Sequence, residues 1–141
     1  MPKAAVFLDS AYAIALSAPK DEHHQRALAL AERIEAQGTR LITTRAVIVE
    51  IGDALSSSQY RQDAIKLLTS FEKDPEFVEI VPISEQLYAK AFQLYRTRPY
   101  KEWSMTDCIS FIVMRERGLI DALTHDKDFR QAGFNALMRE A

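Results

Sequence analysis

Four acidic residues, Asp9, Glu50, Asp107 and Asp126, stand out because each lies in or beside an apolar stretch. Asp9 and Asp126 follow the short runs "AVFL" and "ALTH", while Glu50 and Asp107 interrupt the helix-like stretches "AVIVEIGDAL" and "SMTDCISFIVM". Burial of a carboxylate without a partner is costly, so each acid needs a reason to be there. Gathered in one cleft, the four would repel one another and raise one another's pKa values, and a hard divalent cation would remove that repulsion.

The chemistry that such a cleft favours is phosphodiester hydrolysis. Mg²⁺ and Mn²⁺ prefer carboxylate, water and phosphate oxygens, and they activate water while neutralising charge on the phosphate. Zinc is not indicated, because Cys108 is the only cysteine and the three histidines, at positions 23, 24 and 125, lack ligand spacing. The sequence therefore predicts a metal-dependent hydrolase in which all four acids are metal ligands and catalytic residues.

Three of the acids also have a structural explanation. Asp9 and Asp126 could each cap a helix that follows a strand, a position that Asp often fills. Ser104 and Asp107 match a capping box, with serine at the N-cap and an acid three residues later. Caps and surface charge alone would make these acids matter for stability and not for activity.

Glu50 is harder to explain by local structure, because it lies on the apolar side of its expected helix. A glutamate there is seldom fully buried unless it is paired, and Arg45 is an available partner. Asp53, one turn further on, competes for the same role. Since Asp53 lies nearer the polar side, Glu50 is the preferred site residue.

The elements that must position these acids alternate between strands and helices. Strands are expected at 4–9, 40–44, 76–82, 121–126 and 134–138, and helices at 11–18, 23–38, 45–55, 60–73, 84–97 and 104–118. This alternation predicts an α/β protein, a three-layer α/β/α domain with a central parallel sheet of four or five strands. The first strand is expected mid-sheet, and ligands of such sheets bind outside the carboxyl ends of the strands. Apolar residues at helical spacing, such as Leu28, Ile65 and Tyr95, are expected to face the core.

Composition limits the classes of function. The 141 residues, 48% of them hydrophobic and 27% charged, predict a single domain over 1–141. A net charge of −2 argues against a protein that coats nucleic acid by bulk electrostatics, so contact with phosphate must be local. No apolar run is long enough to span a membrane, and one cysteine fits a reducing compartment; a cytoplasmic protein without membrane contact is expected.

Four stretches in order, "FLDSAYAIAL", "TTRAVIVEIGDAL", "WSMTDCISFIVM" and "ALTHDKDF", resemble those of PIN-domain proteins. Within that superfamily, the chain looks like the VapC-type toxins of bacterial toxin–antitoxin pairs. The resemblance covers nearly the whole chain. It implies a PIN-like domain with Mg²⁺- or Mn²⁺-dependent endoribonuclease activity towards RNA. It also implies a homodimer that is silenced by a small cognate antitoxin, whose tail occupies the active-site groove.

Carried over by position, the four acids match the acidic quartet of that family. The resemblance adds a secondary set of residues beside the quartet: Ser10, Thr106, Thr124 and Asp128. His125 stands where many relatives have a small residue, and it is expected at the surface, although it could reach the site.

The segment "YRTRPYKEW", residues 95–103, leads directly into the third acid. Its cations Arg96, Arg98 and Lys101 alternate with aromatic residues, which is a pattern that can hold a single RNA strand by charge and base stacking. A solvated loop whose aromatic residues pack on the core is an equal alternative.

Other α/β families fit less well. Haloacid-dehalogenase-type phosphatases need a second acid where this chain has Ala11, and a receiver domain needs an acidic pair that "AVFLDS" lacks. Dinucleotide binding needs a glycine-rich turn, and the four glycines are scattered. The alternative that stays open is a non-catalytic PIN-like RNA-binding or adaptor module.

Overall fold

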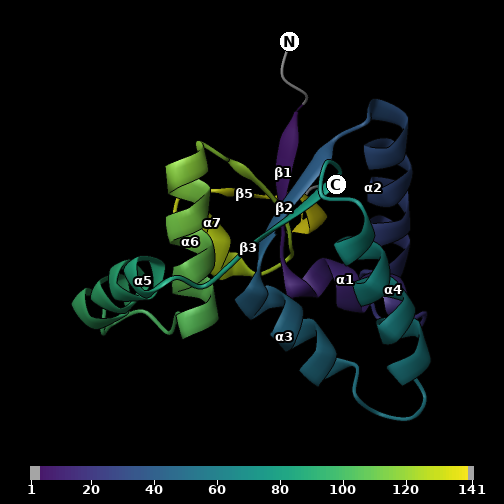
Figure 1. The fold of residues 1–141 in the computed structure, drawn as a ribbon, viewed down its shortest axis with the longest axis horizontal. Helices are drawn as coiled ribbons and strands as arrows, with labels where there is room; N and C mark the ends of the chain where they lie inside the picture. The colour runs from purple at the N-terminus through teal and green to yellow at the C-terminus, as the bar shows by residue number, and fades with distance from the viewer. Residues whose placement is uncertain (1–3, 140–141) are drawn as a thin grey trace.

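The computed structural model describes residues 4–139, and these form a parallel sheet covered by helices on both faces (Figure 1). The strands, in the order β3-β2-β1-β4-β5 across the sheet, are β1 (Ala5–Leu8), β2 (Arg40–Thr44), β3 (Val78–Val81), β4 (Asp121–Leu123) and β5 (Asn135–Ala136). All neighbouring pairs are parallel. The predicted α/β/α architecture and the central place of the first strand are confirmed. The prediction of one domain over 1–141 also includes residues 1–3 and 140–141, which lie outside the described residues.

The helices form the two outer layers. They are α1 (Ser10–Ser17), α2 (His24–Gln37), α3 (Arg45–Ala54), α4 (Arg61–Lys73), α5 (Glu85–Thr97), α6 (Met105–Arg117), α7 (Lys127–Gln131) and the 3₁₀ turn η1 (Leu137–Arg139). In Figure 1, α2 and α4 lie on one side of the sheet, while α5, α6 and α7 lie on the other. Helix α7 and the turn η1 were not among the expected elements.

Strand β1 is buried between both neighbours because its residues Val6, Phe7 and Leu8 are apolar on both faces. Its register pairs Phe7 with Ile42 of β2 and with Ala122 of β4. The carboxyl ends of β1 and β2 therefore lie at one edge of the sheet, the lower side in Figure 1, where α1 and α3 begin.

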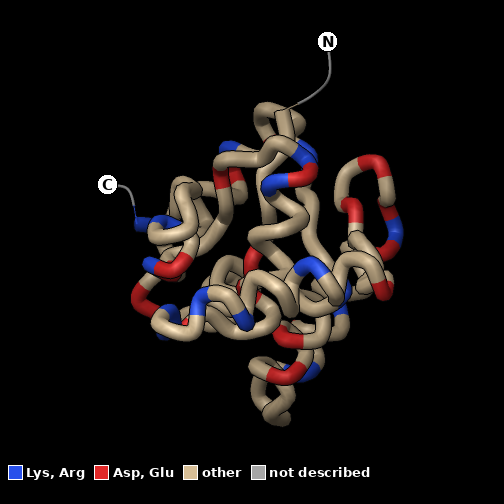
Figure 2. Tube along the Cα trace, turned by 90° about the vertical axis from the view of Figure 1, so that its left-hand side faces the viewer, with Lys and Arg blue, Asp and Glu red and all other residues tan. Residues whose placement is uncertain are grey.

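Charge is distributed without a dominant sign. Lys and Arg residues are interspersed with Asp and Glu residues along the trace in the view of Figure 2. Among the described residues, no helix combines the length and the apolar character that a membrane crossing requires.

Candidate active site

All four predicted acids line a single cleft of about 500 Å³ at the carboxyl edge of the sheet. Asp9 follows β1, Glu50 projects from α3, Asp107 lies in the first turn of α6, and Asp126 caps α7. Residues separated by more than a hundred positions are thus brought together, as expected for strand ends and helix starts at one edge of a parallel sheet.

Asp9 is the most buried member of the cleft, with 5% of its surface exposed. It occupies the N-cap position of α1, yet its side chain makes no capping hydrogen bond. Instead, Thr124 Oγ1 donates to Asp9 Oδ2 at 2.7 Å. Burial raises the pKa of Asp9 to about 7, against the lowering effect of the Thr124 hydrogen bond, and the charges of Glu50 and Asp107 raise it further. Helix capping therefore does not account for this carboxylate.

Glu50 is held in the cleft by Ser10, whose hydroxyl donates to Glu50 Oε1. The position of α3 follows from Thr44, which ends β2 and accepts a hydrogen bond from the Val47 backbone N–H at 3.2 Å. Arg45 is not the partner of Glu50, because its guanidinium binds Glu72 at 2.6 Å.

Asp53, the competitor of Glu50, is exposed and does not line the cleft. The structure therefore brings Glu50, and not Asp53, to the other three acids.

Asp107 combines a capping box with a position in the acidic cleft. Ser104 Oγ accepts from the Asp107 N–H and Asp107 Oδ2 accepts from the Ser104 N–H, each at 3.0 Å, which completes a capping box. The same side chain lines the acidic cleft. Partial burial raises the pKa of Asp107 to about 6 despite these hydrogen bonds, and the charges of Asp126 and Asp128 add to the rise.

Asp126 and Asp128 lie next to Asp107 at the start of α7. Asp126 Oδ1 accepts from the Asp128 N–H at 2.9 Å, and the Asp126 N–H donates to Thr124 Oγ1 at 3.0 Å. Thr124 thus connects Asp9 to Asp126. Burial and the charge of Asp126 raise the pKa of Asp128.

The donor set fits a hard divalent cation. Asp107, Asp126 and Asp128 each offer a carboxylate oxygen, and these oxygens lie within 4.8 Å of one another. Burial, together with the charges of Glu50 and Asp107, raises the pKa of Asp9, so a cation bound here would relieve the repulsion among the carboxylates. Oxygen ligands and negative charge are the features that Mg²⁺ and Mn²⁺ sites share.

The secondary residues divide into two groups. Ser10 and Thr124 contact the acids directly. Thr106 does not line the cleft. Its carbonyl oxygen accepts a hydrogen bond from Ser110 Oγ at 2.9 Å. His125 is half-buried and lines the cleft, so the structure favours the alternative in which it reaches the site.

Three charged residues that were not expected from the sequence also line the cleft. These are Asp21, Lys127 and Arg139. Arg139 donates to the His125 carbonyl oxygen at 2.9 Å, and the His125 ring stacks on His23 with centroids 4.1 Å apart. Asp21 lies in the connection between α1 and α2, Lys127 begins the five-residue α7 and Arg139 ends the turn η1, and no periodicity marks these positions in the sequence.

The predicted RNA-contact residues do not share one surface. Arg96 and Lys101 line a groove of about 730 Å³, to which Ser104 also contributes, and Ser104 lines the acidic cleft as well. Arg98 lines a different hollow, between α5 and α6. The structure therefore separates Arg98 from the two cations with which it was grouped.

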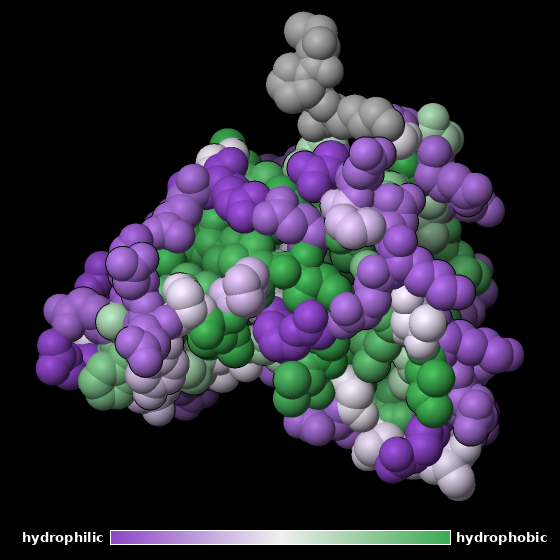
Figure 3. Space-filling view, in the orientation of Figure 1, coloured by the Kyte–Doolittle hydropathy of each residue, from purple (hydrophilic) through white to green (hydrophobic). Residues whose placement is uncertain are grey.

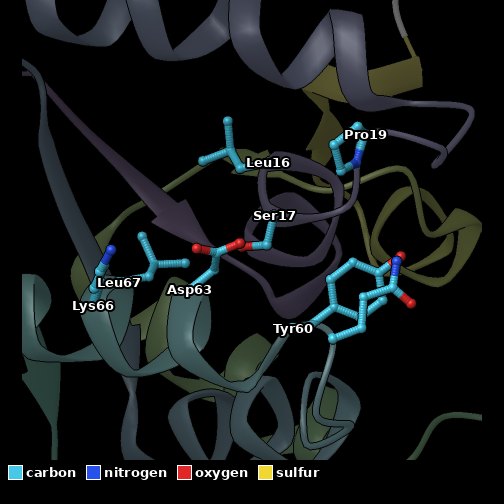
Figure 4. A pocket seen from close by; sticks show the side chains of 8 residues that line it. Leu16, Ser17, Pro19, Tyr60, Asp63, Lys66 and Leu67 are labelled. Carbon is cyan, nitrogen blue, oxygen red and sulfur yellow. The ribbon is translucent and has the colours of Figure 1, made fainter.

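A larger hollow lies away from the acids, where the end of α1 faces the start of α4 (Figure 4). Its volume is about 620 Å³, and its charged lining residues are Asp63 and Lys66. Size alone does not identify a site here, because Asp63 is the only acid among the described residues that line this hollow.

Comparison with known proteins supports the interpretation of the fold. The PIN domain family model matches residues 6–135. The crystal structure of Mycobacterium tuberculosis VapC20, a sarcin–ricin loop cleaving toxin, is similar, with a TM-score of 0.79 and 24% identity over 92% of this chain and 96% of that one. The crystal structure of FitAcB from Neisseria gonorrhoeae is also similar, with a TM-score of 0.61 and 18% identity over 92% of this chain and 96% of that one.

A comparison with curated proteins finds no match. At these identities, the two crystal structures establish a shared fold, while the family model covers most of the sequence. This chain belongs to the PIN domain family.

Proposed function

We propose that this protein is a divalent-metal-dependent endoribonuclease that hydrolyses RNA phosphodiester bonds. The observation that carries the proposal is the meeting of Asp9, Glu50, Asp107 and Asp126 in one cleft, where burial raises the pKa of Asp9 to about 7. A cluster of partly buried, mutually repelling carboxylates, none of which forms an ion pair within residues 4–139, destabilises the fold, which makes a binding role for cations the natural explanation.

Asp9, Glu50, Asp107 and Asp126 would hold Mg²⁺ or Mn²⁺, with Asp128 beside them. A bound ion would neutralise charge on the RNA phosphate and lower the pKa of an attacking water. Ser10 orients Glu50 through its hydrogen bond, and Thr124 fixes the Asp9 carboxylate relative to the Asp126 backbone. No side-chain nucleophile is required.

The partners follow from the family resemblance. VapC20 is a toxin that cleaves the sarcin–ricin loop. By analogy, the present chain would act as a single cytoplasmic domain, the toxin of a toxin–antitoxin pair, as a homodimer blocked by a small antitoxin. Exposed apolar surface is available for contact with a partner protein. Val49 on α3 is 56% exposed, and apolar residues are visible around α3 in Figure 3.

The experiment that tests the activity is cleavage of RNA by the purified protein in Mn²⁺ and, in parallel, in excess chelator. Cleavage is expected with Mn²⁺ and not with chelator, and Glu50→Gln is expected to abolish it. Cleavage that persists in chelator would contradict the proposal. RNA binding with no cleavage under either condition would favour the adaptor alternative instead.

The experiment that tests the pairing is a search for a short open reading frame immediately upstream, followed by co-expression of its product. Growth arrest by this protein alone and rescue by the co-expressed product are expected. Absence of growth arrest would favour a free-standing nuclease.

A further inference from the structure

The groove beside the acidic cleft combines aromatic faces and cations. Tyr95 and Arg96 of α5 form one wall, and Lys101, Trp103 and Ser104 of the connection to α6 form the other. Ser104 lines both this groove and the acidic cleft, so the two spaces adjoin at the start of α6. A chain that crosses the cleft can therefore continue into the groove.

The cations of the groove are placed against aromatic rings and not against carboxylates. The Arg96 guanidinium lies 5.8 Å from the centroid of the Phe92 ring. The Lys101 ammonium lies 5.9 Å from the Tyr100 centroid and 5.8 Å from the Trp103 centroid. Within residues 4–139, neither cation takes part in an ion pair. Their positive charge is available to a phosphate.

Two of the aromatic residues at the groove are open to solvent, whereas Trp103 is buried. Tyr95 is 46% exposed and Tyr100 is 72% exposed, and Tyr95 continues a stack on α5 with Phe92, at 6.4 Å between centroids. Trp103 closes the inner wall, edge-on to the buried Phe111. Its Nε1–H is a buried donor without a hydrogen-bond partner among the described residues.

We propose that this groove binds one unpaired nucleotide of the RNA, adjacent to the phosphate held in the acidic cleft. This inference rests on the proposed function, since it names the form of substrate that the cleft receives. The base stacks on the aromatic wall at Tyr95, while Arg96 and Lys101 contact flanking phosphates. The base must be unpaired, because a base within a duplex does not expose its face for stacking.

Charge favours RNA over a second copy of the protein as the occupant. The groove is lined by two cations, Arg96 and Lys101, and one acid, Glu102, in a chain whose net charge is −2. Without a bound cation the acidic cleft repels phosphate, so an adjoining groove with a local excess of positive charge helps to hold the strand. A second copy of this chain carries 18 cations among its 20 acids, so it offers no continuous line of negative charge comparable to an RNA backbone.

The single tryptophan makes the groove directly observable. Trp103 is the only tryptophan in the sequence, so its emission reports the groove alone. The protein is titrated in excess chelator, which prevents cleavage, with a short single-stranded RNA and with the same sequence as a duplex. Quenching or a shift of the emission is expected with the single strand, at concentrations at which the duplex has little effect.

Matched variants test whether RNA binds in the groove or is attracted only by the general charge of the protein. Tyr95→Ala and Lys101→Ala are expected to weaken single-strand binding by about tenfold or more, since stacking and local phosphate contacts are lost. Arg98→Ala also removes one positive charge, at a position two residues from Arg96. Because Arg98 lines a different hollow, the RNA affinity of this variant is expected to stay within about twofold of that of the wild type. Circular dichroism of each variant checks that the fold is retained.

Three outcomes would overturn the inference. The first is an emission that does not respond to single-stranded RNA, and the second is an equal loss of affinity in Lys101→Ala and Arg98→Ala. The third is an emission that changes with protein concentration alone, which would assign the groove to contact between copies. Because the titration needs no cleavage, a failure of the nuclease proposal would be seen separately, as RNA binding without metal-dependent product.

Discussion

The acidic cleft and the hollow of Figure 4 are of similar size but differ in what they bury. The cleft contains Asp9, which is 5% exposed and has a pKa raised to about 7 by burial. The hollow between α1 and α4 contains the exposed Asp63, with Lys66 on the same helix. The cleft gathers the four predicted acids, of which Asp9 is buried and the other three are half-buried, whereas among the described residues the hollow is lined by a single exposed acid. The concentration of buried like charge, and not volume, marks the site.

The largest difference between the two regions is expected when one carboxylate charge is removed from each of them in separate variants. Asp9→Asn should reduce RNA cleavage by more than about 100-fold, because an amide oxygen is a poor metal ligand. Asp63→Asn, the same chemical change in the hollow, should leave cleavage unchanged and alter stability by less than about 1 kcal/mol. Cleavage rates of both variants under saturating Mn²⁺ provide the measurement. Equal effects of the two substitutions would remove the distinction between the regions.

Metal binding should also distinguish the two places. Added Mn²⁺ should stabilise the wild type and Asp63→Asn by about 2 to 3 kcal/mol at a hundredfold excess over the dissociation constant. Asp9→Asn should lose most of that gain. Thermal unfolding with and without Mn²⁺ gives the comparison, and an equal Mn²⁺ effect in Asp9→Asn would place the ion elsewhere.

The pH dependence of the metal-free protein is the next test. Asp9 and Asp107 have raised pKa values, about 7 and about 6, so the folded state binds their protons more tightly than the unfolded state. Their contribution therefore favours folding at low pH and is lost as the pH rises from about 4 to about 7. In chelator, the free energy of unfolding of the wild type should fall across this range by on the order of 2 kcal/mol more than that of Asp9→Asn.

Urea unfolding at several pH values between about 4 and about 8 measures this difference. With Mn²⁺ present the trend should reverse, because protons and metal compete for the same oxygens. If the free energies of unfolding of the wild type and Asp9→Asn change with pH by the same amount in chelator, the pKa of Asp9 is not raised.

A smaller effect is expected from Thr124→Val, because Thr124 positions Asp9 and does not itself bind the reacting atoms. Loss of its 2.7 Å hydrogen bond should raise the pKa of Asp9 further and shift the pH profile of cleavage upward, with roughly a tenfold lower rate. Thr43→Val is the matched control, since Thr43 Oγ1 donates at 2.7 Å to the Leu8 carbonyl oxygen and not to a carboxylate. It should lower stability without moving the pH profile.

The sequence predicted the site where local rules determine position. Asp9 was placed at mid-sheet because an apolar run such as "AVFL" forms a central parallel strand, and the structure confirms that place. Glu50 and Asp107 were identified because each interrupts an apolar helix face. The structure brings all three to one cleft.

Other features could not be predicted from local patterns. Leu28 and Ile65 are 40% and 50% exposed, since the adjacent Ala27 and Ala64 face the core in their place. The helical spacing of apolar residues does not show which of two adjacent residues faces the core, and close packing of helices favours the smaller of the two. The five-residue α7 is too short for periodicity, and Arg139 reaches the cleft from the last described turn.

The claim at the centre of this account is that the carboxylates are functional and not merely structural, and Asp107→Asn tests it most directly. The amide oxygen of Asn can still accept the Ser104 N–H, so the cap is retained while a repelling charge leaves the cleft. RNA cleavage in Mn²⁺ and the melting temperature in chelator are measured on one preparation. We predict that cleavage is lost while the melting temperature is unchanged or higher. Unchanged cleavage with a lower melting temperature would contradict the account and leave Asp107 as a helix cap alone.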